Sequence, residues 1–169
     1  MRKLMLFFLM MFSSILFSQF ADEDGTQDDP YQITTAVQLN SVRNYNGDAY
    51  SETYFLMMND IDLSDYSPWT PMCNWFRGHF DGGEHIVTGL TIDLPNSDNV
   101  GLFGYLDNGE IKNLTIESAT VTGREYAGII CGYVFLGNIS NCHSSGAVNG
   151  VNYLGGITGY VYEGNITEC

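Results

Sequence analysis

The sequence has few positive charges. Six Lys and Arg residues stand against 20 Asp and Glu residues in a chain of 169, which gives a formal net charge of -14 at pH 7. Such a chain has no basic surface with which to neutralise phosphates, so we predict that nucleic acid is not a partner. The acidity favours solubility and is compatible with cation binding, but it identifies no ligand.

Cysteine is also scarce. The four residues, Cys73, Cys131, Cys142 and Cys169, are too few and too scattered for a disulfide-rich scaffold, and they lack the Cys-x-x-Cys spacing of a zinc site. Cys142 and Cys169 are equivalent in the repeat described below, and stacked strands would place them roughly 4.8 Å apart. A disulfide and two small buried side chains in one interior column both stay open as interpretations.

The sequence lacks a hydrophobic run of the roughly 20 residues that a membrane-spanning helix needs. Its most apolar stretch, Leu4–Phe12, follows Arg2 and Lys3, which is the arrangement of a secretory signal peptide. We predict a signal peptide over residues 1–18 and an acidic flexible leader over residues 19–32. The mature chain is then expected to be secreted or displayed at the cell surface, without a membrane span.

Glycine and aromatic residues, by contrast, are abundant, and many recur at a fixed interval in residues 100–169. Intervals of 28 and 27 residues separate the members of each column: Tyr105, Tyr133 and Tyr160; Ile111, Ile139 and Ile166; Gly104, Gly132 and Gly159. Such a period indicates supersecondary units that stack because none can bury its apolar face alone.

A corner is expected inside each repeat. Ile111 and Leu114 are both apolar, although their odd spacing would place them on opposite faces of a single strand. Asn113 lies between them and Asn141 takes its place in the next copy, and asparagine tolerates the left-handed backbone of a sharp corner. Stacked amides can form a hydrogen-bonded ladder, which Glu168 would interrupt. These features predict an all-β fold, a right-handed parallel β-helix with coils of about 27 residues.

Residues 33–99 are predicted to form an N-terminal cap and the first coils. Thr35 and Gln38 have the spacing of a capping box, which predicts a short helix after Thr35. Alternating apolar residues from Tyr54 predict strands, and Asp81-Gly-Gly predicts a turn with positive φ. The coil before the first clear repeat should contain three equivalent apolar positions. Ile86, Leu90 and Ile92 are expected to correspond to Ile111, Leu114 and Ile116.

Two segments resemble a known repeat family. Gly101-Leu-Phe-Gly matches the Gly-Leu-hydrophobic-Gly signature of GLUG-motif repeat proteins, and Gly156-Ile-Thr-Gly is a close variant. Upstream segments are similar to the region that leads into such repeats: Asp60-Ile-Asp-Leu, Trp69-Thr-Pro and Phe76-Arg-Gly-His-Phe-Asp-Gly. The second copy departs from the signature, with Ile129 where a glycine should open it and one extra residue.

The resemblance implies a parallel β-helix in an extracellular protein. Relatives of this kind include adhesin-like proteins and regions that precede IgA-protease-type peptidases. Residues 100–169 would be a truncated set of GLUG-like repeats. The resemblance carries no catalytic motif, and we assign no catalytic, cofactor-binding or metal-ligating residue and expect no cofactor.

Glycosidic cleavage needs paired carboxylates, and the repeat columns supply none. Glu110 corresponds to Asn138 and Asn165, and Lys112 corresponds to Ser140 and Thr167. Acids from different columns could still converge, so an enzyme stays open as an alternative. Asn113, Asn138 and Asn165 also begin N-glycosylation acceptor sequences, although the repeat geometry explains the same pattern.

Two histidines flank the Asp81 turn. His79 and His85, with Asp81 or Glu84, could form an acid–base or metal cluster, but a turn of polar residues before a strand explains them more simply.

Other isolated candidates have structural explanations as well. Asp60, Asp62 and Asp65 lack the glycine and terminal glutamate of a calcium loop, so corner and solvent roles are favoured. Trp69 and Trp75 either cover an end of the apolar column or contact a sugar ring.

The predicted function is that of a non-enzymatic secreted or cell-surface repeat module for adhesion or rigid display. We expect such a module to bind carbohydrate or an extracellular protein. A polysaccharide lyase or glycosidase of the β-helix type is one alternative, and an N-terminal fragment of a larger surface protease or adhesin is another. The third copy stops at Cys169, just past its corner, so we expect further coils or end-to-end association through this C-terminal coil.

Overall fold

The computed structural model describes residues 20 and 23–169, and the predicted signal peptide and the start of the predicted leader lie outside this part of the chain. The described residues form sixteen strands, one short α-helix and three 3-10 turns. The helix is α1 (Ala36–Ser41), and the 3-10 turns cover Val42–Asn44, Asp48–Tyr50 and Ser64–Tyr66.

All paired strands run parallel, and they form four stacks that we call sheets A to D. Sheet A has the order β1 (Tyr31–Ile33), β2 (Tyr54–Met57), β4 (His79–Asp81), β8 (Glu110–Lys112), β12 (Asn138–Ser140) and β16 (Asn165–Thr167). Sheet B has β13 (His143–Asn149), β9 (Thr115–Thr122), β5 (Ile86–Thr88) and β3 (Ile61–Asp62), with β6 (Thr91–Asp93) also beside β9. Sheet C has β15 (Thr158–Tyr162), β11 (Cys131–Phe135) and β7 (Phe103–Asp107), and sheet D has β10 (Glu125–Gly128) and β14 (Asn152–Gly155).

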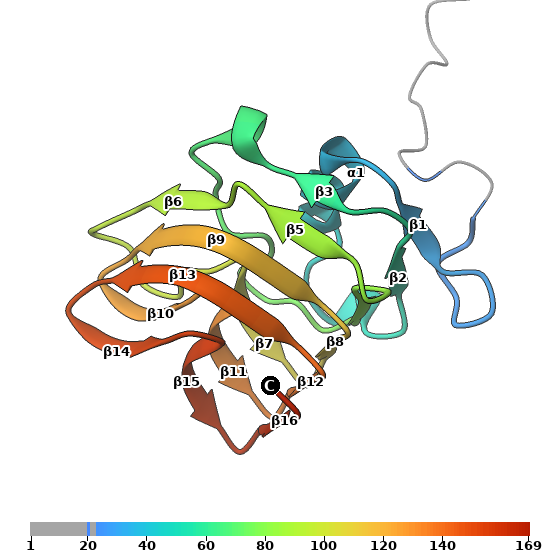
Figure 1. Ribbon diagram of the computed structural model, residues 1–169. Coiled ribbons are helices and arrows are strands. Elements are labelled where there is room, and N and C mark those ends of the chain that lie inside the picture. Colours follow the sequence, from blue (N-terminus) through green and yellow to red (C-terminus); the bar gives the residue numbers. More distant parts are fainter. Residues whose placement is uncertain (1–19, 21–22) are drawn as a thin grey trace, which may run out of the picture.

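The strand register confirms the repeat columns. Ile139 pairs with Ile111 on one side and with Ile166 on the other, and the three tyrosines of sheet C align in the same way. Figure 1 shows β9 and β13 side by side in one layer and β7 and β11 in another, with α1 far from β15 and β16. The described residues are therefore mostly β, with stacked parallel strands in a β-helix-like arrangement.

The predicted corner is present in each copy. Asn113, Asn141 and Glu168 have φ angles of 53°, 49° and 55°. The predicted amide ladder is also present, because Asn141 Nδ2 donates to Asn113 Oδ1 over 2.8 Å. Two further sets of left-handed residues recur at the repeat interval: Asn99, Tyr126 and Tyr153; Asn108, Leu136 and Glu163. A tyrosine or leucine in this region costs about 1–2 kcal/mol, so packing between coils must impose these corners.

The interior of the stack is a continuous apolar core. Ile111 and Ile139 are completely buried, whereas Ile166 is only partly buried and packs against the core. The third copy differs in this way because no described strand lies beyond β16 in sheet A. Towards the other end the core is filled by large rings, all with at most 1% exposure: Phe20, Phe55, Phe76, Phe80 and Phe103.

The short predicted helix lies over this aromatic end. The Thr35 side chain accepts a hydrogen bond from the Gln38 backbone N–H over 3.3 Å, which confirms the N-cap. Gln38 Oε1 accepts from the Thr34 backbone N–H over 2.9 Å. Leu39 and Val42 are buried, whereas Val37 is 52% exposed. Within the described part of the chain, no helix is long and apolar enough to cross a membrane.

The expected correspondences of Ile86 with Ile111 and of Ile92 with Ile116 are wrong. Phe80 pairs with Ile111 and Val87 with Ile116. Ile86 pairs with Thr115, and Ile92 pairs with Val121. The reason is the turn between β4 and β5, which is longer than the Asn113 corner between β8 and β9. Counting from the corner therefore misplaces the apolar residues of the earlier coil.

The opening glycine of the second copy is also one position earlier than expected. Gly128 pairs with Gly155, and the preceding Ala127 bridges to Val100, which precedes Gly101. The extra residue thus follows the glycine in the second copy. Ile129 is not a substituted glycine but an inserted buried residue, 2% exposed.

Candidate functional site

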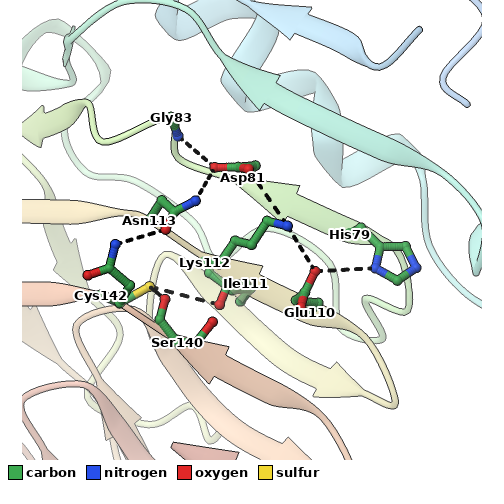
Figure 2. Close-up of polar contacts among 10 residues, drawn as sticks. His79, Asp81, Gly83, Glu110, Ile111, Lys112, Asn113, Ser140 and Cys142 are labelled. Carbon is green, nitrogen blue, oxygen red and sulfur yellow. Dashed lines mark hydrogen bonds and ion pairs between the residues drawn. The ribbon is translucent and has the colours of Figure 1, made fainter. Parts of the chain in front are cut away.

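Four polar side chains meet on the outward face of sheet A. The register pairs His79 with Glu110 and Asp81 with Lys112. Because side chains alternate along a strand, the intervening Phe80 points into the core and the four polar groups point outward. Figure 2 shows this group, which we call the β4–β8 cluster.

Lys112 lies between the two carboxylates of the cluster. Lys112 Nζ lies 3.5 Å from Glu110 Oε2 and 3.8 Å from Asp81 Oδ2. His79 Nδ1 lies 3.6 Å from the same oxygen of Glu110. These side chains are 30–39% exposed, so each ion pair contributes at most about 1 kcal/mol to stability.

Asp81 has a structural role within the cluster. Its Oδ1 accepts hydrogen bonds from the Gly83 backbone N–H and from Asn113 Nδ2, each over 2.9 Å. It thereby fixes the predicted turn, in which Gly83 has a φ of 58°, and it begins the amide ladder (Figure 2). Asn113 uses its amide nitrogen on Asp81 and its amide oxygen on Asn141. The amide of this candidate glycosylation site is therefore engaged within the fold.

A hollow of about 260 Å³ adjoins the cluster. The Tyr54 and His79 rings stack along one part of it, with centroids 4.3 Å apart and planes 7° apart. The other lining residues are Gln27, Pro30, Phe55, Leu56, Asp81 and Lys112. Beyond the corner, a second hollow of about 220 Å³ is lined by Glu84, Asn113, Thr115, Asn141 and His143.

The structure does not bring the two histidines together around Asp81. His79 approaches Glu110, whereas His85 lies on the other side of the turn, with its Nδ1 3.2 Å from Asp60 Oδ1. Asp60 also accepts the Ile86 backbone N–H over 2.9 Å. Within the described residues, no group of three or more His, Cys, Asp or Glu side chains is arranged to hold a metal ion.

The cluster is better suited to ligand contacts or to structure than to acid–base catalysis. A glycosidase needs two carboxyl groups free to act on opposite sides of one bond. Here one oxygen of Asp81 accepts two hydrogen bonds at the turn, and Glu110 is flanked by Lys112 and His79. A polar ligand can use the outward atoms of these groups without any change in the turn.

The structure gives different positions to the remaining candidate residues, the acidic residues near β3 and the two tryptophans. Asp62 Oδ1 accepts the Ser64 backbone N–H over 2.9 Å, which is a corner role. Trp69 covers the core: it is 2% exposed, and the Arg43 guanidinium lies 5.5 Å from its ring centroid. Trp75 is 42% exposed on the surface.

The four cysteines are unpaired, and three of them are buried. Burial raises the pKa of the Cys73, Cys131 and Cys142 thiols to about 12, from an ordinary value of 9.0. These thiols stay protonated in the folded chain and ionise more easily once it unfolds. Their contribution to stability is complete below about pH 9 and is lost as the pH rises towards 12.

A thiol reagent such as Ellman's reagent should therefore label one cysteine rapidly in the folded chain at pH 8. Cys169 is exposed and should react, whereas the other three need unfolding because the reagent attacks accessible thiolates. The labelled thiols are counted in buffer and again in denaturant. Rapid labelling of two or more thiols in buffer would contradict the observed burial.

The polar partners of His79 and Asp81 were not predicted. In the later repeats the residues equivalent to Glu110 and Lys112 are neutral. Their partners in β4 lie 31 residues earlier, an interval that differs from the 28 and 27 of the later repeats. Alignment of Phe80 with Ile111 as core residues is the signal that would have found them.

No protein-family model matches the chain. A "Putative Gly-rich membrane protein" of Evansella cellulosilytica is 37% identical over 114 residues, which cover 62% of this chain and 13% of that protein. "Halomucin" of Haloquadratum walsbyi is 35% identical over 124 residues, which cover 64% of this chain and 1% of that protein. The chain thus matches only a small part of either relative.

A similar fold occurs in the crystal structure of a "putative immunoglobulin A1 protease" from Bacteroides ovatus. The match has a TM-score of 0.59 and 24% sequence identity, and it covers 77% of this chain and 41% of that chain. At this identity the likeness concerns the fold alone.

Proposed function

We propose that the chain is a non-enzymatic repeat module of a secreted or cell-surface protein and serves adhesion or rigid display. The observation that carries this proposal is the unbroken series of parallel pairings from β1 to β16 in sheet A. Such a stack extends along one axis and holds its outward side chains at fixed intervals. A right-handed β-helical solenoid of GLUG-like coils is the form that we propose for it.

The comparisons support the surface location. One relative is named as a membrane protein. Both relatives are much longer than the segment that this chain matches. We propose that the chain likewise works as one module of a larger surface protein, in which the substrates and partners of the whole depend on other segments. A signal peptide over residues 1–18 and end-to-end association through the C-terminal coil complete this proposal.

An assay for product release from polysaccharides tests the proposal that the module is not an enzyme. The purified chain is incubated with acidic and neutral polysaccharides, and new reducing ends and unsaturated products are measured. We expect neither to rise above the level of a heat-unfolded sample. Release by the native chain that disappears in Asp81→Asn would show that the β4–β8 cluster is catalytic and would overturn the proposal.

Adhesion and display are separated by a binding assay. Beads that carry the chain are applied to a glycan array and to immobilised extracellular proteins. Specific retention supports adhesion, and its absence from both surfaces leaves rigid display as the function.

A further inference from the structure

A shallow groove of about 540 Å³ lies on the outward side of sheet C, away from the β4–β8 cluster. It combines three aromatic residues with two amides and one carboxylate: Trp75, Tyr105, Phe135, Asn46, Asn74 and Asp107. These residues come from the segments before sheet C and from strands β7 and β11. The groove therefore joins the first coils to the clear repeats.

Trp75 is exposed but firmly held. Its indole Nε1 donates a hydrogen bond to Asp107 Oδ2, and its backbone carbonyl accepts the Gly47 N–H over 2.9 Å. The Arg77 guanidinium carbon lies 5.7 Å from the Trp75 ring centroid, over the ring. Because these contacts fix the ring before any ligand arrives, little conformational entropy is lost when a ligand stacks on it.

The neighbouring aromatic rings are already stacked on the next coil. Tyr105 stacks on Tyr133 with centroids 5.0 Å apart, and Phe135 stacks on Tyr162 with centroids 5.3 Å apart. Their planes are within 8° of parallel, so a ring face of each is used inside the ladder. Trp75 makes no such ring contact within the described residues and is 42% exposed, so part of its ring surface is accessible to a ligand.

The groove carries only one carboxylate, although the chain is strongly acidic. Asp107 Oδ2 lies 3.6 Å from Arg77 Nη1, and this guanidinium also pairs with Asp48 Oδ1. The other polar lining groups are the amides of Asn46 and Asn74 and the hydroxyl of Tyr105, which can donate to and accept from the hydroxyl groups of a ligand. The formal net charge of -14 disfavours approach of a polyanion.

We propose that this groove binds a neutral polysaccharide built of pyranose units. The apolar C–H face of a sugar ring stacks on Trp75, and the two asparagine amides bind its hydroxyl groups. This inference rests on the adhesion part of the proposed function, for which it names the ligand class and the site.

Affinity electrophoresis of the full chain through gels that contain a soluble polysaccharide tests the proposal. The neutral probes are β-glucan, xylan, mannan and galactan, and polygalacturonate is the anionic probe. We expect retardation by at least one neutral probe and none by polygalacturonate. Trp75→Ala should weaken the retarded interaction by about tenfold or more, because it removes the stacking surface.

Tyr153→Ala is the matched control, since Tyr153 is an aromatic residue 52% exposed outside the groove. It should leave binding unchanged. Asn74→Ala is a second groove variant with an exposed side chain and should weaken binding by about threefold or more, so the test does not depend on the folding of Trp75→Ala. Circular dichroism checks that each variant is folded.

Three results would overturn the proposal: no retardation by any neutral probe, retardation by polygalacturonate alone, or full binding by Asn74→Ala together with a folded Trp75→Ala. Binding to an extracellular protein without binding to these probes would leave adhesion intact and reject only the groove. Release of sugar products would instead reject the non-enzymatic function while leaving binding in the groove measurable.

Discussion

Replacement of Ile139 by Asp is expected to leave the chain unfolded at 25 °C. Ile139 is completely buried and lies in register between Ile111 and Ile166. The substitution removes an apolar side chain from the core, at about 2–5 kcal/mol for the lost packing, and puts a carboxyl group there without a partner. A total loss above about 5 kcal/mol matches or exceeds the stability of many domains.

Asn138→Asp provides a matched control in the same strand. Asn138 is exposed on the outward face, and its Oδ1 accepts a hydrogen bond from Asn165 Nδ2 over 2.9 Å, which an aspartate oxygen can also accept. Both variants place a carboxyl group on β12, on its buried face at position 139 and on its outward face at position 138. Circular dichroism and urea unfolding should show a folded Asn138→Asp chain with stability within about 1 kcal/mol of the wild type. A folded Ile139→Asp chain would contradict the core position of this column.

The repeat columns and corners could be predicted from the sequence because the same residue types recur at the same positions in each copy. Ile111 and Leu114 on either side of Asn113 require a corner, and the next copy repeats the requirement at Asn141. The Thr35 N-cap was predictable for a similar reason, since it depends on residues three positions apart. Where two copies agree, spacing alone gives the register.

The β4–β8 cluster could not be predicted in the same way. β4 lies before the clear repeats, and its offset of 31 residues from β8 differs from the later 28 and 27. The partners of Asp81 and His79 therefore depend on the length of an irregular connection, which no local pattern specifies. The groove at Trp75 could not be predicted for a similar reason: Asn46, Asn74 and Trp75 come from loops whose path is set by packing.

Gly132, which ends the repeat signature in the second copy, and Gly156, which opens it in the third, are expected to respond very differently to substitution. Gly132→Ala should be the damaging change. A Cβ atom at Gly132 would lie 2.4 Å from the carbonyl carbon and 2.6 Å from the Cα of Asn99, and 2.5 Å from the backbone nitrogen of Val100. These are backbone atoms of the adjacent coil, so no side-chain rotation relieves the contact. The coils would have to separate and lose hydrogen bonds between them, at a cost of about 3 kcal/mol or more.

Gly156→Ala is the control, although Gly156 opens the motif that resembles the repeat signature. A Cβ atom there would meet only Ser144 Oγ, at 3.7 Å, which is an ordinary contact. The register explains this tolerance, because Gly155 and not Gly156 pairs with Gly128. At Gly155 a Cβ atom would lie 2.2 Å from the Thr158 carbonyl oxygen. Urea unfolding should therefore give a stability within about 1 kcal/mol of the wild type for Gly156→Ala and a greatly lowered midpoint for Gly132→Ala. Equal losses in both variants would mean that the motif, rather than the contact between coils, determines which glycine is required.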